Sequence, residues 1–340
     1  MINTSGKFVM IKYFILFFIE IAFITNGYAG INGSADPRIV IGWDGERPDY
    51  IDSTTQNLWN TSPYNSIVRI ERDNSYGTGE FISPRHILTN AHVAMDCGIN
   101  NNKECEIYTS DDDLQFGRVV FRGMKVLKSD GAFDEDKVYE HPDRDWAILE
   151  ITGDYCRPEY REMIEAGTIE RGLWRAGFGS LRVLDKTDLD NIRRAYLVYL
   201  DAGGTDGTET GGMNIDEREQ KYQIFREEFL RITGKDFETD YDSDILTLKK
   251  IQNCRFRDVV EGFPGDSVLW HSCSGWTGDS GSTLKMMSGN LVVGVHNNSY
   301  LNITSYTDHT RSDMALGSST FMYNPKIQSA IEKAKQDCKN

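Results

Sequence analysis

The chain has 340 residues, a formal net charge of -15 at pH 7, 39% hydrophobic residues and 11% aromatic residues. This apolar content is sufficient for one large domain or two smaller ones. An acidic chain lacks the basic surface that DNA, RNA or an anionic membrane requires, so the composition argues against these as main partners.

The first 29 residues have the features of a secretory signal peptide. Lys7 and Lys12 precede the apolar run YFILFFIEIAFIT, and Gly27 and Ala29 occupy the small positions of a cleavage site. We predict cleavage after Ala29 and a secreted or periplasmic protein that has no membrane contact once the leader is removed. A membrane anchor is the alternative interpretation, but the run is shorter than the ~20 apolar residues that span a bilayer.

Export would allow the six cysteines to form disulfides. Sequence alone permits many pairings. The pairs that we predict are Cys97–Cys105, Cys254–Cys273 and Cys156–Cys338. No Cys-x-x-Cys motif and no cluster of Cys and His indicates a zinc site, so no metal is predicted.

From about residue 65 the chain consists largely of short strand-like segments. The segments are SIVRIER, FIS, ILTNAHV, RVVFRGMKVL, DWAILEIT, WRAGFGSLRVL, SVLWHSC, STLKMMSG, LVVGVHN and STFMY, with early turns predicted at YGTGE and PRH. Alternating β-branched residues between Gly, Pro and Asn are typical of antiparallel strands. Many short strands joined by turns favour a mainly β sandwich or barrel over βαβ units.

Residues from about 185 to 250 break this pattern because they are polar and acidic. Asn214 followed by Glu217 forms a capping box, and Gly234 is a suitable C-terminal cap, so a helix is predicted between them. The apolar residues on one face of this helix are Tyr222, Phe225, Phe229 and Ile232. The pattern predicts a surface insertion with one amphipathic helix docked on the barrel.

Two patterns in the insertion resemble ligand sites but lack the required residues. The glycine-rich stretch over 203–212 has no Gly-Lys-Ser/Thr, which a phosphate loop needs. The acidic run DFETDYDSD lacks the glycine and the glutamate of an EF-hand loop, which favours a solvated loop. We therefore predict that the protein uses no cofactor.

The C-terminal segment is predicted to form a second helix. Asn324 provides an N-cap, and Pro325 suits the first helical position. The helix is expected over residues 325–337.

Three segments supply the parts of an activated nucleophile. A serine hydroxyl needs a base to take its proton, and the base needs a third group to fix its tautomer. LTNAHVA places His92 after an apolar strand, and DRDWAILEI places Asp145 where a following apolar strand would shield it. GWTGDSGS places Ser280 between glycines, where the backbone can turn sharply and direct N–H groups at a substrate oxygen.

Each segment alone has an ordinary structural explanation. A single histidine after a strand is more often structural than catalytic, Gly-Asp-Ser-Gly is more often a turn, and the aspartate could cap a strand. The three together, in the order His, Asp, Ser in an exported β-rich chain, favour a hydrolase.

LTNAHV, DWAIL and GDSGS resemble the three signature segments of the trypsin/chymotrypsin-fold serine peptidases. The resemblance covers most of residues 39–323 apart from the insertion. It implies two six-stranded antiparallel β-barrels, the first over 39–150 and the second over 151–340. The second barrel would contain the partly helical insertion at about 185–250 and end in the C-terminal helix.

The resemblance also implies a role for each residue of the site. His92 would be the general base, Asp145 would orient it, and Ser280 would be the nucleophile. The backbone N–H groups of Gly278 and Ser280 would form the oxyanion hole. The substrate would be a protein or peptide.

The segment VIGWDGERPDYIDSTTQNLWNTSPYNSIVRI is similar to the start of bacterial glutamyl endopeptidases. In that branch a histidine after the nucleophile helps to bind a substrate carboxylate, and His296 in VVGVHNN has that place; simple packing in the strand is the alternative. Residues 273–277 contain no acid to pair with Arg or Lys, so Ser274, Thr277 and His296 are expected to bind an acidic side chain. An apolar or aromatic side chain is the second choice.

The residue before the nucleophile is Asp279, whereas the glutamyl branch often has no acid there. In the trypsin branch this aspartate pairs with a new N-terminal ammonium made by proteolysis. The segment DPRIVIG offers such a cut between Arg38 and Ile39, which would make residues 30–38 a propeptide and the chain a zymogen. Ile39 would then either pair with Asp279 or help to line the pocket.

Two other functions are compatible with parts of this pattern. A non-catalytic peptidase-fold module used for binding has no need to keep all three site residues. An esterase or lipase would place its serine in a Gly-x-Ser-x-Gly elbow before a helix, which this chain lacks.

Overall fold

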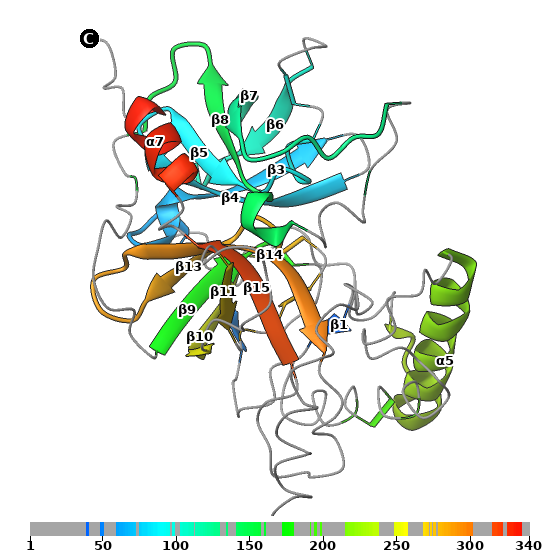
Figure 1. Cartoon of the computed structure of the whole chain (residues 1–340). Coiled ribbons are helices and arrows are strands. Elements are labelled where there is room, and N and C mark those ends of the chain that lie inside the picture. Colours follow the sequence, from blue (N-terminus) through cyan, green and yellow to red (C-terminus); the bar gives the residue numbers. More distant parts are fainter. Residues whose placement is uncertain are drawn as a thin grey trace, which may run out of the picture.

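The fold is described from a computed structural model (Figure 1). The residues that it describes are 39–40, 48–50, 59–72, 75–95, 97–98, 103–111, 113–129, 134, 141–157, 160, 172–179, 191, 194–195, 198, 215–237, 248–257, 268–271, 273, 275–276, 278–301, 315–321 and 325–334. The leader, residues 30–38, the acidic run DFETDYDSD after its first two residues, and Cys338 lie outside these ranges. The structure therefore tests the predictions about the strands and the site, but not the predicted export.

Six antiparallel strands form a closed barrel in the first half of the chain (Figure 1, top). Their order is β3 (Ile67–Arg72), β4 (Ser75–Ser83), β5 (His86–Thr89), β8 (Ala147–Thr152), β7 (Leu114–Arg122) and β6 (Cys105–Tyr108). Alternate apolar side chains of these strands fill the barrel interior, among them Val68, Ile70, Ile87 and Leu149. A short 3₁₀ turn, η3 (Pro142–Arg144), leads into β8.

A seven-stranded antiparallel sheet forms most of the second half (Figure 1, bottom). Its order is β11 (Val268–His271), β15 (Ala315–Phe321), β14 (Val292–Leu301), β13 (Thr283–Met286), β9 (Gly172–Gly177), β10 (Lys249–Arg257) and β2 (Pro48–Tyr50). Strand β11 also pairs with β10, and β1 (Ile39–Val40) pairs with β12 (Gly275–Trp276). The predicted mainly β class and one six-stranded barrel are confirmed.

Two α-helices match the predicted positions. Helix α5 (Ile215–Thr233) ends before Gly234, whose φ of 72° and N–H bond to Leu230 O at 2.8 Å form the expected glycine cap. Phe225 and Phe229 are fully buried and pack against Phe237 from the segment after the helix. In Figure 1, α5 lies to one side of the strands, and its docking on a barrel stays a prediction.

Helix α7 (Pro325–Ala334) packs at the junction of the two groups of strands. The apolar cluster that contains Ile327 and Ile331 of this helix also contains Ile148 of β8 and Val293 of β14. The helix therefore helps to fix one group of strands against the other.

The predicted turn at YGTGE is wrong, because these residues lie inside strand β4. The glycines are there for close packing and not for turning. A Cβ at Gly77 would lie 2.7 Å from Val93, and one at Gly79 would lie 2.7 Å from Ile70 and Ile87. Such distances are shorter than real side-chain contacts, so the strand needs glycine at both positions.

Strands β6 and β10 were not among the predicted strands. Glu106 interrupts the short apolar run of β6, and β10 contains four charged residues, which weakens the apolar signal that marks a strand. Strand β10 also begins at Lys249, so the predicted insertion at about 185–250 extends slightly into the sheet.

A buried ion pair connects the barrel to the second sheet. Lys285 Nζ lies 2.6 Å from Glu80 Oε2, and their side chains are 0% and 1% exposed. Ser66 Oγ donates to Glu80 Oε1 at 2.8 Å, Thr283 Oγ1 donates to Oε2, and the Lys285 ammonium lies 4.4 Å from the centre of the Trp174 ring. Buried charges remain stable only when their polar partners are present, so this contact fixes how the two halves meet.

The disulfides Cys97–Cys105 and Cys254–Cys273 are present as predicted. Cys156 is also disulfide-bonded, and its predicted partner lies outside the described residues. None of the helices in the described ranges is long and apolar enough to cross a membrane.

We predict that Glu80→Gln lowers the free energy of unfolding by about 3–5 kcal/mol, because it leaves the Lys285 ammonium buried without its counter-charge. Arg118→Ala is the matched control, since it removes the solvent-exposed ion pair with Glu150 and should cost about 1 kcal/mol or less. Urea unfolding of both variants measures the difference. Equal losses in the two variants would contradict the structural role of the buried pair.

Candidate active site

His92 and Asp145 form a hydrogen-bonded pair at the edge of the barrel. His92 lies in the turn that follows β5, and Asp145 lies between η3 and the start of β8. Strands β5 and β8 are hydrogen-bonded neighbours in the barrel. His92 Nδ1 lies 2.7 Å from Asp145 Oδ2, and the His92 backbone N–H donates to Oδ1 at 3.0 Å. The carboxylate is fully buried while the imidazole is 19% exposed, so solvent reaches the pair only through the imidazole.

Two further contacts fix the orientation of this pair. Asn90 Nδ2 donates to the Asp145 backbone carbonyl at 2.8 Å, and the Ala94 N–H donates to Asn90 O at 3.1 Å. An ionised carboxylate only accepts hydrogen bonds, so His92 Nδ1 carries the proton. The Nε2 atom is then the nitrogen that can accept a proton from a nucleophile.

The turn over residues 278–281, which we call the nucleophile turn, has a backbone that only glycine adopts easily. Gly278 has φ 94° and Gly281 has φ 85°. A Cβ at Gly278 would lie 2.5 Å from Phe178 O, and one at Gly281 would lie 2.0 Å from Thr78 O. The glycines around Ser280 are thus required by backbone conformation and by close contact with strand β4.

Strand β4 brings the nucleophile turn to the His92 segment. Thr78 N donates to Ser280 O at 2.8 Å, and Thr78 Oγ1 donates to Gly278 O at 2.9 Å. The position of a Cβ on Gly77 would lie 2.7 Å from Val93 and 3.1 Å from Ser280 O. The residue next to His92 and the carbonyl of Ser280 therefore contact the same glycine.

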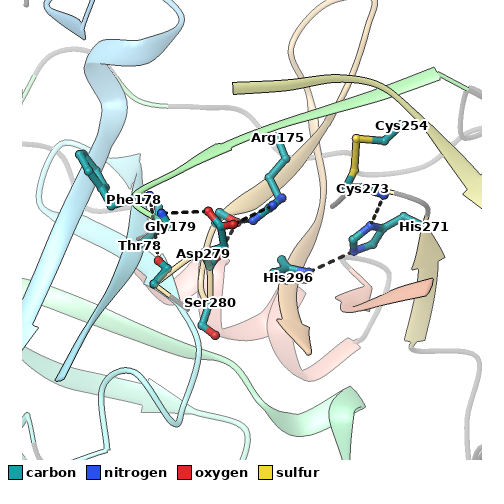
Figure 2. A network of polar contacts seen from close by, with 12 residues as sticks. Thr78, Arg175, Phe178, Gly179, Cys254, His271, Cys273, Asp279, Ser280 and His296 are labelled. Atoms are coloured by element: carbon teal, nitrogen blue, oxygen red, sulfur yellow. Dashed lines mark hydrogen bonds and ion pairs between the residues drawn. A yellow bond between two sulfur atoms is a disulfide. The ribbon is translucent and has the colours of Figure 1, made fainter. Parts of the chain in front are cut away.

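Ser280 itself is half-buried, and its Oγ donates to Asn297 O at 3.4 Å. This is a long and hence weak contact. Figure 2 shows the Ser280 side chain directed away from the Asp279 carboxylate, on the opposite side of the turn. The Ser280 hydroxyl is therefore only weakly held.

Asp279 is buried beside an arginine from the neighbouring strand. Arg175 of β9 donates from Nη2 to Asp279 Oδ2 at 3.0 Å, and Gly179 N donates to Oδ1 at 3.1 Å (Figure 2). Ile39, the residue that we predicted as a partner of Asp279 or as part of the pocket, pairs through its backbone with Trp276 in β1 and β12. Arg38, Ser274 and Thr277 lie outside the described residues.

His296 is buried behind Ser280 and contacts a second histidine. The Gly281 N–H donates to His296 O at 2.9 Å, which places this strand against the nucleophile turn. The Cys273 N–H donates to His271 Nδ1 at 3.1 Å, so His271 must carry its proton on Nε2. That Nε2–H lies 3.2 Å from His296 Nδ1 and donates to it, so His296 carries its own proton on Nε2 (Figure 2).

Burial lowers the pKa of His296 well below that of free imidazole, and coulombic interactions with Arg175, His271 and His92 lower it further. His296 is therefore neutral near pH 7.

Sequence reasoning missed Arg175 and His271. Each is a single titratable residue inside an otherwise apolar strand, in GLWRAG and SVLWHSC, and that is the signal that could have indicated them. Among the described residues, no group of three or more His, Cys, Asp or Glu side chains could hold a metal ion.

Neither a protein-family model nor a curated protein sequence matches the chain. Solved structures do match. A Glu endopeptidase in complex with MPD is 15% identical, with 86% of this chain and 98% of that chain covered and a TM-score of 0.45. The Rv3671c protease in its inactive form is 15% identical, with 84% and 98% covered and a TM-score of 0.41. At these scores the side chains, and not the neighbours' names, must decide the function.

We predict that Gly278→Ala destabilises the protein by more than the ~1–3 kcal/mol that a strained backbone conformation costs, because the new Cβ would also overlap Tyr76 and Phe178. Gly289→Ala is the matched control: Gly289 has φ 78°, but the nearest atom to its Cβ is Leu291 Cγ at 4.0 Å. Thermal unfolding compares the two variants. A smaller effect at Gly278 than at Gly289 would show that the nucleophile turn is not packed as described.

Proposed function

We propose that the protein is a secreted serine endopeptidase that cleaves peptide bonds through an acyl-enzyme intermediate. The observation that carries this proposal is the His92–Asp145 pair, a buried carboxylate hydrogen-bonded to an accessible imidazole, together with a serine on a turn whose glycines have positive φ. These are the parts that nucleophilic catalysis by serine requires.

In the first step, Ser280 Oγ rotates from Asn297 O to His92 Nε2 and attacks the carbonyl carbon of the scissile peptide bond. His92 Nε2 takes the hydroxyl proton as the new C–O bond forms, and buried Asp145 stabilises the resulting imidazolium through Nδ1–H. The imidazolium then gives that proton to the leaving amine as the C–N bond breaks. Water, activated by the same base, hydrolyses the acyl-enzyme.

The oxyanion that develops in both steps would be held by the N–H groups of Gly278 and Ser280. The Gly278 carbonyl is bonded to Thr78, which fixes the turn on which both N–H groups lie. Donors that are held in place before the reaction need no reorganisation, which makes them effective in stabilising the transition state.

The second half of the molecule would be a second six-stranded barrel. The pairing of β11 with both β15 and β10 supports closure of a ring that also contains β14, β13 and β9, with β2 added at β10. The disulfides support export through the predicted leader, because such bonds persist in oxidising compartments.

The preferred substrate has an acidic side chain on the residue before the scissile bond. His296 presents an Nε2–H donor, and the His271 and Cys273 contacts leave it no other tautomer. Ser274 and Thr277 would complete the pocket. An apolar or aromatic side chain is the alternative.

Cleavage after Arg38 would free Ile39 beside the pocket segment. Backbone pairing of Ile39 with Trp276, directly before Thr277 and the nucleophile turn, supports the role of Ile39 in lining the pocket. The mature chain would then begin at Ile39.

We predict that a fluorophosphonate probe labels the folded protein on Ser280 and that Ser280→Ala abolishes the label. Asp145→Asn should fold but lose about 10⁴-fold in kcat, because the histidine would then be held in the wrong tautomer. Mass spectrometry of the labelled peptide and peptide hydrolysis assays measure the two effects. A folded protein that takes no label would favour the non-catalytic binding module instead.

We further predict that His296→Gln lowers kcat/KM for a substrate with Glu before the scissile bond far more than for the matched Gln substrate. The Glu-to-Gln preference of the unmodified protein should stay constant from pH 6.5 to about 9, because the lowered pKa of His296 means that its imidazole is already neutral throughout this range. A preference that fades above pH 7 would mean that an imidazolium binds the carboxylate, contrary to this account. If the preferred residue is neither Glu nor Asp, cleavage of a peptide library would identify it.

A further inference from the structure

We propose that Arg175 is a positioning residue that holds the nucleophile turn in its catalytic form in the uncut chain, so that activity needs no new N-terminus at Ile39. The inference rests on the proposed function, and it concerns how the site of that function is assembled.

The Asp279 carboxylate already has a buried counter-charge from within the fold. The side chains of Arg175 and Asp279 are 1% and 8% exposed, and their atoms lie 3.0 Å apart. A buried carboxylate requires a cation and hydrogen-bond donors, which in the resembled family come from the ammonium made by proteolysis. Here the guanidinium of Arg175 and the N–H of Gly179 supply both.

The same guanidinium also holds the far side of the nucleophile turn. Arg175 Nη1 donates to Ser282 Oγ at 2.9 Å, and Ser282 Oγ donates to Asp279 O at 2.5 Å. The Ser282 N–H donates to that carbonyl as well, at 3.0 Å. One planar group therefore fixes the residue before Ser280 and the second residue after it.

The surrounding sheet is shaped to accommodate this contact. Arg175 lies in the middle of β9, paired with Leu284 on one side and with Ile251 on the other. A Cβ at Gly177 would lie 2.8 Å from Asp279 Oδ1, and one at Gly179 would lie 2.7 Å from Oδ2. Glycine at these two positions leaves space for the carboxylate, so the ion pair is part of the folded sheet.

The consequence concerns the oxyanion hole. The Ser280 N–H belongs to the same peptide unit as the Asp279 carbonyl that Ser282 holds, so rotation of this unit would turn that donor away from the substrate oxygen. Because Arg175 prevents this rotation without cleavage, the hole should form when the chain folds.

The first test compares the cut and uncut protein. The full chain with Arg38→Gln, shown by intact mass to keep the residues before Ile39, is treated with the fluorophosphonate probe beside protein that has been cut at this bond. We expect labelling rates within a few-fold of each other. Labelling only of the cut protein would overturn the inference and leave the proposed function standing, whereas no labelling of either would refute the proposed function.

The second test removes the guanidinium. Arg175→Met should lower kcat ~10²–10³-fold with little change in KM, as expected when a transition-state donor is misplaced. Arg157→Met is the matched control, since Arg157 is also a buried arginine that donates to one carboxylate, Asp111, and to the hydroxyls of Ser110 and Tyr155, but beside the first barrel.

The comparison separates positioning from general stability. We expect kcat of Arg157→Met, measured below its unfolding temperature, to stay close to that of the unmodified protein. An equal loss of kcat in the two variants, or a loss confined to KM in Arg175→Met, would overturn the inference. If Arg175→Met does not fold, labelling of the uncut Arg38→Gln chain decides.

Discussion

Strand β4 is the constraint on which the site depends. Thr78 bonds through its backbone N–H to Ser280 and through its hydroxyl to Gly278, and the Phe178 N–H donates to the same hydroxyl at 2.9 Å. Gly77, one residue earlier, packs against Val93 beside His92. This short segment of β4 thus contacts the loop of His92, the loop of Ser280 and the end of β9.

Each of three buried carboxylates around this strand has a specific polar partner. Asp145 is hydrogen-bonded to His92, and Asp279 and Glu80 form ion pairs with Arg175 and Lys285. Such pairs cost desolvation free energy and depend on good geometry, so they contribute more to specifying one arrangement than to overall stability. Two of them fix groups of the proposed reaction, and the third fixes the barrel against the second sheet.

Much of the fold could be predicted because its signals are local. Alternating apolar residues indicate most strands, Gly234 and Pro325 mark helix boundaries, and the motifs around His92, Asp145 and Ser280 are short and distinctive. The partners of Asp279 and His296 could not be predicted, since Arg175 and His271 are distant in sequence and a lone charged residue in a strand does not reveal its neighbour. The glycines of YGTGE predict a turn, but glycine is also required where a strand packs closely against its neighbours, and the sequence does not distinguish the two cases.

The most direct measurement is a crystal structure of the protein with a peptide boronic acid bound, because this compound mimics the tetrahedral intermediate. The account predicts a covalent bond from boron to Ser280 Oγ, with one boronate oxygen about 2.7–3.1 Å from the N–H groups of Gly278 and Ser280. His92 Nε2 should lie within hydrogen-bonding distance of the adduct, with Asp145 on the other side of the ring. A crystal in which the boronate leaves Ser280 unmodified, or in which His92 and Ser280 lie on separate surfaces, would contradict the account.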